Sequence, residues 1–153
     1  IDLAIRIGKL NDSALIATKL CDIEFGYFAS PDYLEEHGEP VKPQDLSQHN
    51  CLTYSLTSHA RGWGLQDQSI SLTGSFSANN GEALCEAAIQ GLGVISLPRF
   101  IVESALGNGK LKPVLAEYVS APAGLYAIRL SRQFTPAKVR LLIEFLKENL
   151  QQH

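Results

Sequence analysis

The sequence predicts an α/β fold, because short apolar segments typical of strands alternate along the chain with helical patterns. Residues 76–97 read as a strand, a polar turn, a helix and a second strand, an order typical of a right-handed parallel crossover. A second clear helix is expected near the C-terminus, where Thr135 is a suitable N-cap and Pro136 occupies the favoured first position. One face of that helix is apolar and contains Val139, Leu142, Ile143, Leu146 and Leu150.

Four apolar segments in the first half of the chain are expected to form strands: residues 3–7, 15–20, 25–29 and 51–56. The first strand is expected to be buried, and Cys21 and Asp22 are expected to separate the second strand from the third. Pro31 is expected to open a short helix over 32–37 that Gly38 ends, since proline favours a helix start and glycine a helix end. Two further elements are expected in this half, a helical turn at 44–46 and an alternating strand at 70–73.

In the central crossover, Asn79 is the expected N-cap of the helix, and Glu82 follows it at the spacing of a capping box. The expected buried face of this helix has the spacing i, i+3, i+4, i+7 and contains Leu84, Ala87, Ala88 and Gly91. Gly91 and Gly93 are expected to end the helix before a short apolar strand at 94–97.

The rest of the chain continues the alternation of strands and helices. A helix is predicted from Pro98 to about Leu106, with Gly107 and Gly109 ending it. Its expected buried residues are Phe100, Ile101, Val102 and Ala105. Strands are expected at two later segments, 111–115 and 124–130. The single tryptophan, Trp63, is expected to fill the core rather than to bind a ligand.

The composition narrows the class of protein. The chain has 153 residues, of which 45% are hydrophobic and 19% charged, as is typical of an ordinary soluble globular protein. No apolar run approaches the roughly 18 residues of a membrane span, and no signal-peptide pattern opens the chain. The net charge of −3 gives no electrostatic reason for this segment to bind nucleic acid. Cys21, Cys51 and Cys85 are odd in number and widely separated, which favours a reducing compartment over a disulfide framework.

Two polar features are candidates for ligand binding. Arg6 lies near the carboxyl end of the first strand, where open α/β sheets bind ligands and a guanidinium can hold a carboxylate. The turn Asn79-Asn80-Gly81 lies at a helix N-terminus, where backbone amides and the helix dipole favour an anion or a polar ligand. Each feature has a purely structural alternative, because Arg6 could pair with a neighbouring acid and the turn could only cap the helix.

Catalytic, metal and cofactor sites are not expected. The chain lacks a Gly-x-Ser-x-Gly elbow, and its paired glycines lack the rest of any phosphate-loop or dinucleotide fingerprint. His49 and Cys51 would share one face of a strand, but nothing indicates an orienting third group or an electropositive pocket. His37, His59 and His153 do not have the spacing of metal ligands.

Five segments follow one another in a recognisable order: DLAIRIG, FASPDYLEEHGEPVKPQDLSQHNCLTYS, GWGLQD, NNGEALCEAAIQGLGVISLPRFIVESAL and LYAIRLSRQFTPAKVRLLIEFLKENL. In this order they resemble the effector-binding domain of LysR-type transcriptional regulators, over essentially the whole chain. The resemblance implies a type 2 periplasmic-binding-protein-like fold, with two Rossmann-like α/β lobes joined by two crossover strands.

The resemblance also implies a division into lobes. Residues 1–24 would end lobe one, residues 25–118 would form lobe two, and residues 119–153 would return to lobe one. Lobe one would be truncated at its N-terminal side, and the winged helix-turn-helix domain and linker helix of the family would be missing. The sequence contains no methionine and opens directly on an apolar strand, so we expect it to be a piece of a longer protein.

By this resemblance, the chain would be the ligand-sensing domain of a cytoplasmic regulator that forms a homodimer or homotetramer and is not an enzyme. DNA would be bound only through the missing N-terminal domain, and no membrane partner is implied. A small anionic effector would bind between the lobes, with contacts from Arg6, Ile7, Gly8, Tyr54, Ser55, Asn79, Asn80 and Gly81.

Two other classes of protein share this alternation of strands and helices. One is a lobe of a secreted solute-binding protein that serves a transporter, which the unpaired cysteines and the collinear motifs disfavour. The other is a small α/β hydrolase or transferase, which would need a nucleophile–base pair that the sequence does not contain.

Overall fold

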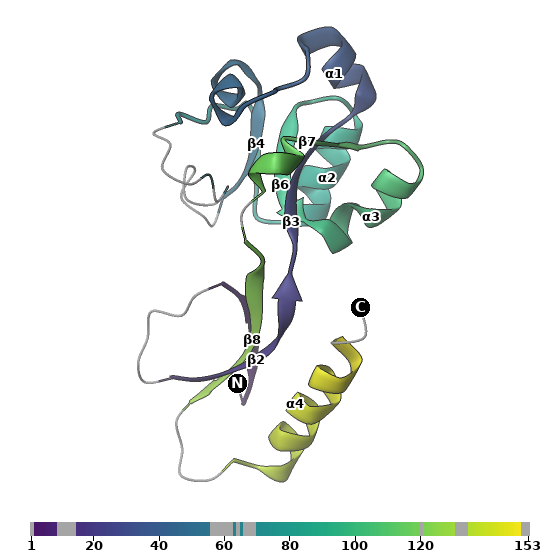
Figure 1. The fold of residues 1–153 in the computed structure, drawn as a ribbon. Coiled ribbons are helices and arrows are strands. Elements are labelled where there is room, and N and C mark those ends of the chain that lie inside the picture. The colour runs from purple at the N-terminus through teal and green to yellow at the C-terminus, as the bar shows by residue number, and fades with distance from the viewer. Residues whose placement is uncertain are drawn as a thin grey trace. The chain divides into compact units, whose positions relative to one another are not determined.

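The computed structural model describes residues 2–8, 15–55, 63, 65, 70–119, 121–130 and 135–150. The chain divides into two compact units (Figure 1). Unit 1 consists of residues 1–24 and 122–153, and unit 2 consists of residues 25–121. Each unit combines strands with helices, so the predicted α/β class is confirmed.

Unit 1 contains an antiparallel sheet and one long helix. The strands are β1 (Ala4–Ile7), β2 (Leu15–Ile23) and β8 (Ala123–Leu130), in the order β1-β8-β2. Helix α4 (Ala137–Leu150) packs against β2. Among the described residues of this unit, the buried hydrophobic side chains are Leu20, Ala127, Ile128 and Val139. An ion pair of 2.6 Å joins the Nζ atom of Lys138 in α4 to the Oδ2 atom of Asp2.

The first strand is exposed rather than buried. Half of the surface of Ile5 is accessible, and Ile7 is also exposed, because β1 lies at the edge of the three-stranded sheet. The predicted break at Cys21 and Asp22 is also wrong, since both residues lie inside β2. An irregularity in pairing between Lys19 and Cys21 lets the strand continue instead of ending there.

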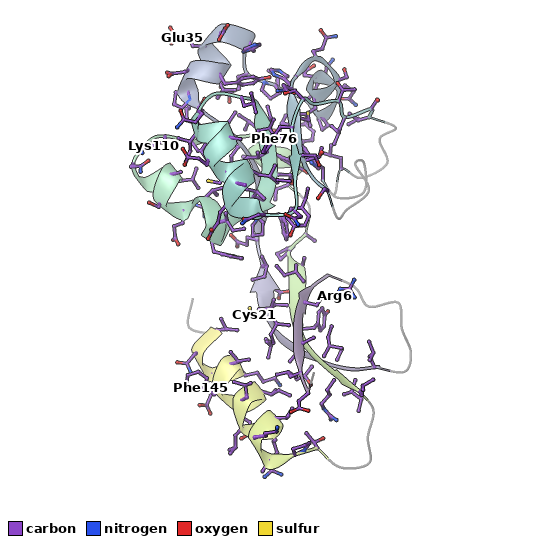
Figure 2. The ribbon with its side chains drawn as sticks, turned by 180° about the vertical axis from the view of Figure 1, so that it is seen from behind. Arg6, Cys21, Glu35, Phe76, Lys110 and Phe145 are labelled. Carbon is purple, nitrogen blue, oxygen red and sulfur yellow. The ribbon has the colours of Figure 1, made fainter. Side chains whose placement is uncertain are left out.

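The apolar stripe of α4 is only partly covered. Val139 is buried, whereas Leu142 on the same stripe is exposed. Phe145 is exposed as well and is labelled on α4 in Figure 2. The helix begins at Ala137, one residue later than predicted, and the carbonyl of Pro136 accepts hydrogen bonds from the next turn. Unit 1 therefore exposes apolar side chains on its helix and on its edge strand.

Unit 2 contains a five-stranded mixed sheet with helices on both faces. Its strands are β3 (Phe25–Ala29), β4 (Cys51–Tyr54), β5 (Ser77–Ala78), β6 (Val94–Pro98) and β7 (Lys112–Val114), in the order β5-β4-β6-β3-β7. Its helices are α1 (Pro31–His37), α2 (Gly81–Ile89) and α3 (Arg99–Gly107), with 3-10 turns η1 (Pro43–Gln48) and η2 (Ala116–Tyr118). Strands β5 and β6 both pair in parallel with β4, which lies between them. The predicted parallel crossover through α2 is therefore confirmed.

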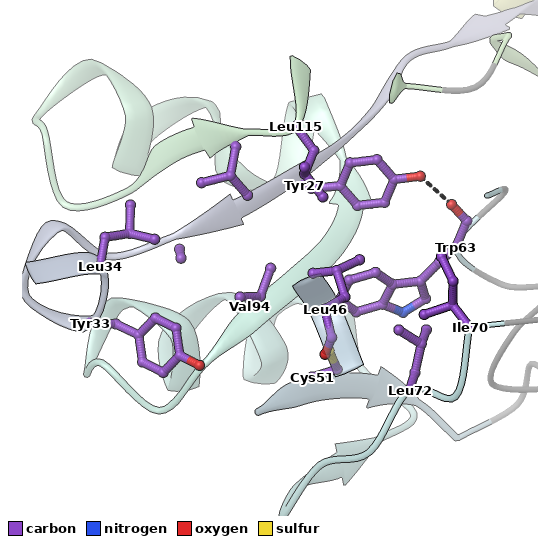
Figure 3. Packing of buried hydrophobic residues seen from close by; sticks show 12 residues of the cluster. Tyr27, Tyr33, Leu34, Leu46, Cys51, Trp63, Ile70, Leu72, Val94 and Leu115 are labelled. Atoms are coloured by element: carbon purple, nitrogen blue, oxygen red, sulfur yellow. Dashed lines mark hydrogen bonds between the residues drawn. The ribbon is translucent and has the colours of Figure 1, made fainter. Parts of the chain in front are cut away.

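Two clusters of buried side chains lie on the two faces of this sheet. Consecutive residues of a strand point to opposite faces, so Phe28 belongs to one cluster and Ala29 to the other. The first cluster packs beneath α1 and η1 and includes Tyr33, Leu34 and Leu46 (Figure 3). The second cluster packs beneath α2 and α3 and includes Leu84, Cys85, Ala88, Val102 and Ala105.

Trp63 lies in the first cluster, which confirms its predicted structural role. It is 5% exposed, and its ring stacks on Tyr27 with the ring centroids 5.7 Å apart. The Tyr27 hydroxyl donates a hydrogen bond to the backbone carbonyl of Trp63 (Figure 3). Burial raises the pKa of Tyr27 to about 12, so the phenol remains a hydrogen-bond donor at neutral pH.

Replacing Tyr27 with Phe should lower the free energy of unfolding by about 1–2 kcal/mol, because the Trp63 carbonyl loses its donor while the ring stacking remains. Urea unfolding followed by the fluorescence of the single tryptophan measures this change. Tyr118→Phe is the matched control, since Tyr118 is exposed, and its expected effect is below about 0.5 kcal/mol. Equal stability of the two variants would contradict a stabilising role for the Tyr27 hydroxyl.

Several local predictions in unit 2 need correction. The N-cap of α2 is Asn80, not Asn79, because the Asn80 carbonyl accepts from the amide of Leu84 and its Oδ1 atom from the amide of Glu82. The predicted capping box with Glu82 therefore does not form. Phe100 is 60% exposed, although it was expected to be buried.

The predicted strand at 70–73 is not a strand, although its alternation correctly identifies Ile70 and Leu72 as buried. Strand β4 ends at Tyr54, Ser55 forms a turn, and residue 56 lies outside the described part of the chain. The segment at 70–73 still contacts the sheet, since the Thr73 carbonyl accepts from the amide of Cys51 at the start of β4.

Candidate functional site

Strands β4 and β5 end at the same edge of the unit 2 sheet. Tyr54 pairs with Ala78, and the amide of Ser55 donates to the carbonyl of Ala78 at 2.8 Å. Because the two strands run in parallel, this pairing places Tyr54 and Ser55 beside Asn79. The carboxyl ends of parallel strands are the usual location of ligand sites in open α/β sheets.

Helix α2 begins directly after this edge. Its N-cap Asn80 uses its own Oδ1 atom to bind the amide of Glu82 at 2.8 Å, so that amide is not available to a ligand. Gly81 lies close to the side chains of α3 and β6. A Cβ atom at Gly81 would lie 2.8 Å from Cδ1 of Ile101. The positive end of the helix dipole favours an anion here, while the carboxylate of Glu82 in the first turn opposes one.

These residues differ in exposure. Ser55, Asn79 and Asn80 are exposed, and Gly81 is half-buried. Tyr54 is also half-buried and packs against the second cluster, so part of its ring is structural. The structure thus brings together five of the eight predicted site residues, at one edge of one sheet. The group offers hydroxyl, phenol and amide functions but no positively charged side chain.

The other three predicted site residues lie in unit 1. Arg6 and Ile7 end β1, Gly8 follows it, and the amide of Gly8 donates to the carbonyl of Gly124 at 2.9 Å. Gly8 has a φ of +98°, a conformation that residues with a side chain rarely adopt, which explains a glycine at this strand end. Ile7 pairs with Leu125 and exposes part of its side chain.

Arg6 is one of three polar side chains in a row across the sheet. It lies directly opposite Tyr126 of β8, and Tyr126 lies opposite Lys19 of β2. Residues opposite one another in an antiparallel sheet point to the same face, so two cations flank a phenol. Lys19 also forms an ion pair of 2.8 Å with Asp22, and the hydrogen bond in this pair raises the pKa of Lys19. This row can bind a carboxylate through Arg6 and Tyr126.

Sequence reasoning missed Tyr126 and Lys19. Each becomes a candidate only through the strand register, which joins positions more than 100 residues apart. One local signal was available. Gly124 precedes Tyr126 by two residues, and a Cβ atom at Gly124 would lie 2.5 Å from the Tyr126 ring. The spacing Gly-x-Tyr in a strand is consistent with an aromatic ring lying over a glycine.

The region around His49 and Cys51 has no features of a catalytic pair. Cys51 is fully buried, and burial raises the pKa of its thiol to about 12, so it remains protonated at neutral pH. Its Sγ atom donates to the carbonyl of Leu46, while the His49 ring bonds to Tyr33 instead. Within the described ranges, no three His, Cys, Asp or Glu side chains form a group that could hold a metal ion. None of the described helices is long and apolar enough to cross a membrane.

A protein-family model and several curated proteins match nearly the whole of this chain. The family model of the LysR substrate binding domain matches residues 1–151. The transcriptional regulator CrgA of Neisseria meningitidis serogroup B is 33% identical over 98% of this chain and 52% of its own length. The regulator DmlR of Escherichia coli K12 is 35% identical over the whole chain and 51% of its own length. The chain thus spans about half the length of these curated relatives, which are transcriptional regulators rather than enzymes.

Solved structures of transcriptional regulators also match nearly the whole of this chain. The regulatory domain of CrgA from Neisseria meningitidis matches with a TM-score of 0.83 and 33% identity, over 98% of this chain and 76% of that one. Full-length AphB, a virulence activator of Vibrio cholerae, matches with a TM-score of 0.77 and 29% identity, over 95% of this chain and 51% of that one. These matches do not favour the alternative of a solute-binding protein.

Proposed function

Because the chain belongs to the LysR substrate binding domain family, we propose that it is the ligand-sensing domain of a longer transcriptional regulator. Units 1 and 2 would correspond to lobe one, formed by residues 1–24 and 119–153, and lobe two, formed by residues 25–118. A separate winged helix-turn-helix domain would bind DNA, since the net charge of −3 gives no electrostatic reason for this chain itself to bind nucleic acid. The regulator would act in the cytoplasm as a homodimer or homotetramer, and effector binding would change how it binds DNA.

We further propose that the effector is a small carboxylate or similar anion. The observation that carries the choice of an anion is the exposed guanidinium of Arg6. The edge at which β4, β5 and the start of α2 meet adds hydroxyl, phenol and amide groups from Tyr54, Ser55, Asn79 and Asn80. In unit 1, Arg6 supplies a guanidinium beside Tyr126, and Ile7 and Gly8 complete that strand end. The Arg6 side chain is exposed, so a ligand in solution can reach its guanidinium.

Arg6→Ala should weaken binding of an anionic effector about tenfold to hundredfold, since a lost charge-assisted hydrogen bond costs about 1.5–3 kcal/mol. Asn80→Asp should also weaken binding, because aspartate keeps the cap of α2 but adds a negative charge at the site. Thermal-shift screening with succinate, glutamate and benzoate would provide a first ligand, and calorimetric titration would then measure its affinity for each variant.

Two control variants match these changes. Arg140→Ala removes an exposed arginine from α4, and Asn108→Asp makes the same charge change at the C-cap of α3. Both controls should bind as the unmodified protein does. Unchanged affinity in Arg6→Ala and Asn80→Asp would remove both residues from the effector site.

A further inference from the structure

Three ring side chains of unit 2 lie side by side between α1, η1 and β4. Tyr33 of α1 stacks on His37, with the ring centroids 4.3 Å apart, and its other neighbour is the tilted ring of His49. Tyr33 is 2% exposed and His49 is 8% exposed, so both polar tips need partners inside the protein. The Tyr33 hydroxyl bonds to the Nδ1 atom of His49 at 3.0 Å and to the backbone amide of Asn50 at 3.0 Å.

These two hydrogen bonds favour the neutral form of His49. The amide of Asn50 can only donate, so the Tyr33 oxygen accepts from it. A phenol has one proton to donate, and among the described residues its only acceptor is Nδ1 of His49. Donation by Tyr33 requires a neutral His49 with its proton on Nε2.

His37 has the opposite arrangement. Its Nδ1 atom faces the backbone carbonyl of Tyr33 at 3.1 Å, so Nδ1 must carry a proton and donate it. This hydrogen bond is the same in the neutral and cationic forms of His37.

We propose that neutral His49 stabilises the packing of α1 and η1 against β4, and that protonation of His49 weakens this packing. A proton on Nδ1 would occupy the position to which Tyr33 donates, and the phenol proton would then have no acceptor among the described residues. The buried Tyr33 side chain would have to move or leave a polar hydrogen unpaired, which is costly in the interior. Acidification would therefore loosen α1 while leaving the core beneath α2 and α3 intact.

The charged groups around His49 have opposite effects on its pKa. His37 on α1 opposes a second positive charge, whereas Asp45 on η1 favours one. The Asp45 carboxylate is itself held by the amides of Val41 and Lys42, at 2.9 and 3.0 Å. Cys51 on β4 remains a neutral thiol. Burial is the largest effect, and together with His37 it lowers the pKa of His49.

A lowered pKa means that the unfolded chain binds the proton more readily than the folded one. The stabilisation by neutral His49 is therefore fully present above the ordinary histidine pKa of about 6.5, and it is lost as the pH falls through the lowered value.

The first test is the tautomeric state of the histidines in the unmodified protein at about pH 7.5, read from long-range ¹H–¹⁵N correlations of the imidazole rings. We expect a proton on Nε2 of His49 and on Nδ1 of His37, with His37→Asn and His49→Asn spectra providing the assignments. A proton on Nδ1 of His49 at this pH would overturn the proposal.

The second test compares urea unfolding at about pH 7.5 and about pH 5.5, followed by Trp63 fluorescence, since Trp63 and Tyr33 share one cluster. Asparagine at position 49 keeps an acceptor near the place of Nδ1 but does not titrate. Acidification should therefore raise the unfolding equilibrium constant several-fold more in the unmodified protein and in His37→Asn than in His49→Asn. The same pH dependence in all three proteins would overturn the proposal.

Discussion

Gly93→Ala is expected to lower the free energy of unfolding by about 3 kcal/mol or more. A Cβ atom at Gly93 would lie 2.0 Å from the carbonyl oxygen of Asn50, which is backbone and cannot turn aside. That same oxygen accepts the hydrogen bond from the amide of Val94 that joins the starts of β4 and β6. Relief of the clash would therefore separate two central strands. Urea unfolding followed by far-ultraviolet circular dichroism measures the loss.

The same argument applies to Gly74, where a Cβ atom would lie 1.8 Å from the carbonyl oxygen of Cys51. Gly107→Ala is the control for both substitutions. Gly107 lies in the last turn of α3 with open space around its Cα atom, so alanine there should change stability by no more than about 1 kcal/mol, in the stabilising direction. If Gly93→Ala were as stable as Gly107→Ala, the close approach of the two strands would be incorrect.

The elements of unit 2 could be predicted because their patterns are local. Short, nearly continuous apolar runs mark β3 and β6 as strands buried on both faces, and a helical spacing marks α2 between two short strands. Proline and glycine set the two ends of α1, where Gly38 has a positive φ and its amide donates to the carbonyl of Leu34. These signals come from residues within one or two turns of each other.

Burial could not be predicted in the same way. The apolar residues of β1 and the ring of Phe100 have the composition of a core, but exposure depends on which other segment covers them. The choice of Asn80 over Asn79 as the N-cap is likewise non-local. The strand β5 pairs with β4 up to Ala78, and the side chain and carbonyl of Asn80 then accept from the first turn of α2.

The candidate site also contains some residues that a local sequence pattern predicts and others that only the fold brings together. The turn before α2 is visible in the sequence as two asparagines and a glycine after a strand. The neighbours of Arg6 are not visible, because Tyr126 and Lys19 reach its row through the antiparallel register of β8. Asn50 was also missed as a structural residue, since its partners lie 25 and 42 residues away.

Asn50→Ala is expected to lower the free energy of unfolding by about 2–3 kcal/mol, because one carboxamide joins three segments of unit 2. Its Nδ2 atom donates to the hydroxyl of Ser75 at 2.9 Å and to the carbonyl of Leu92 at 2.7 Å. Its Oδ1 atom accepts from the amide of Ser75 at 2.7 Å. Alanine removes all three hydrogen bonds and leaves the Ser75 amide and the Leu92 carbonyl without these partners.

Two further variants separate these contributions in urea unfolding. Ser75→Ala removes only one hydroxyl and should cost less than half as much, roughly 0.5–1 kcal/mol. Asn50→Asp keeps the acceptor for the Ser75 amide but turns a carboxylate oxygen toward the Leu92 carbonyl, so at neutral pH it should be no more stable than Asn50→Ala. Protonation of that aspartate restores a donor, so Asn50→Asp should recover stability relative to Asn50→Ala as the pH falls below about 4. An Asn50→Ala protein that loses no more stability than Ser75→Ala would show that the bond to Leu92 contributes nothing, and that the start of β4 is held by its backbone alone.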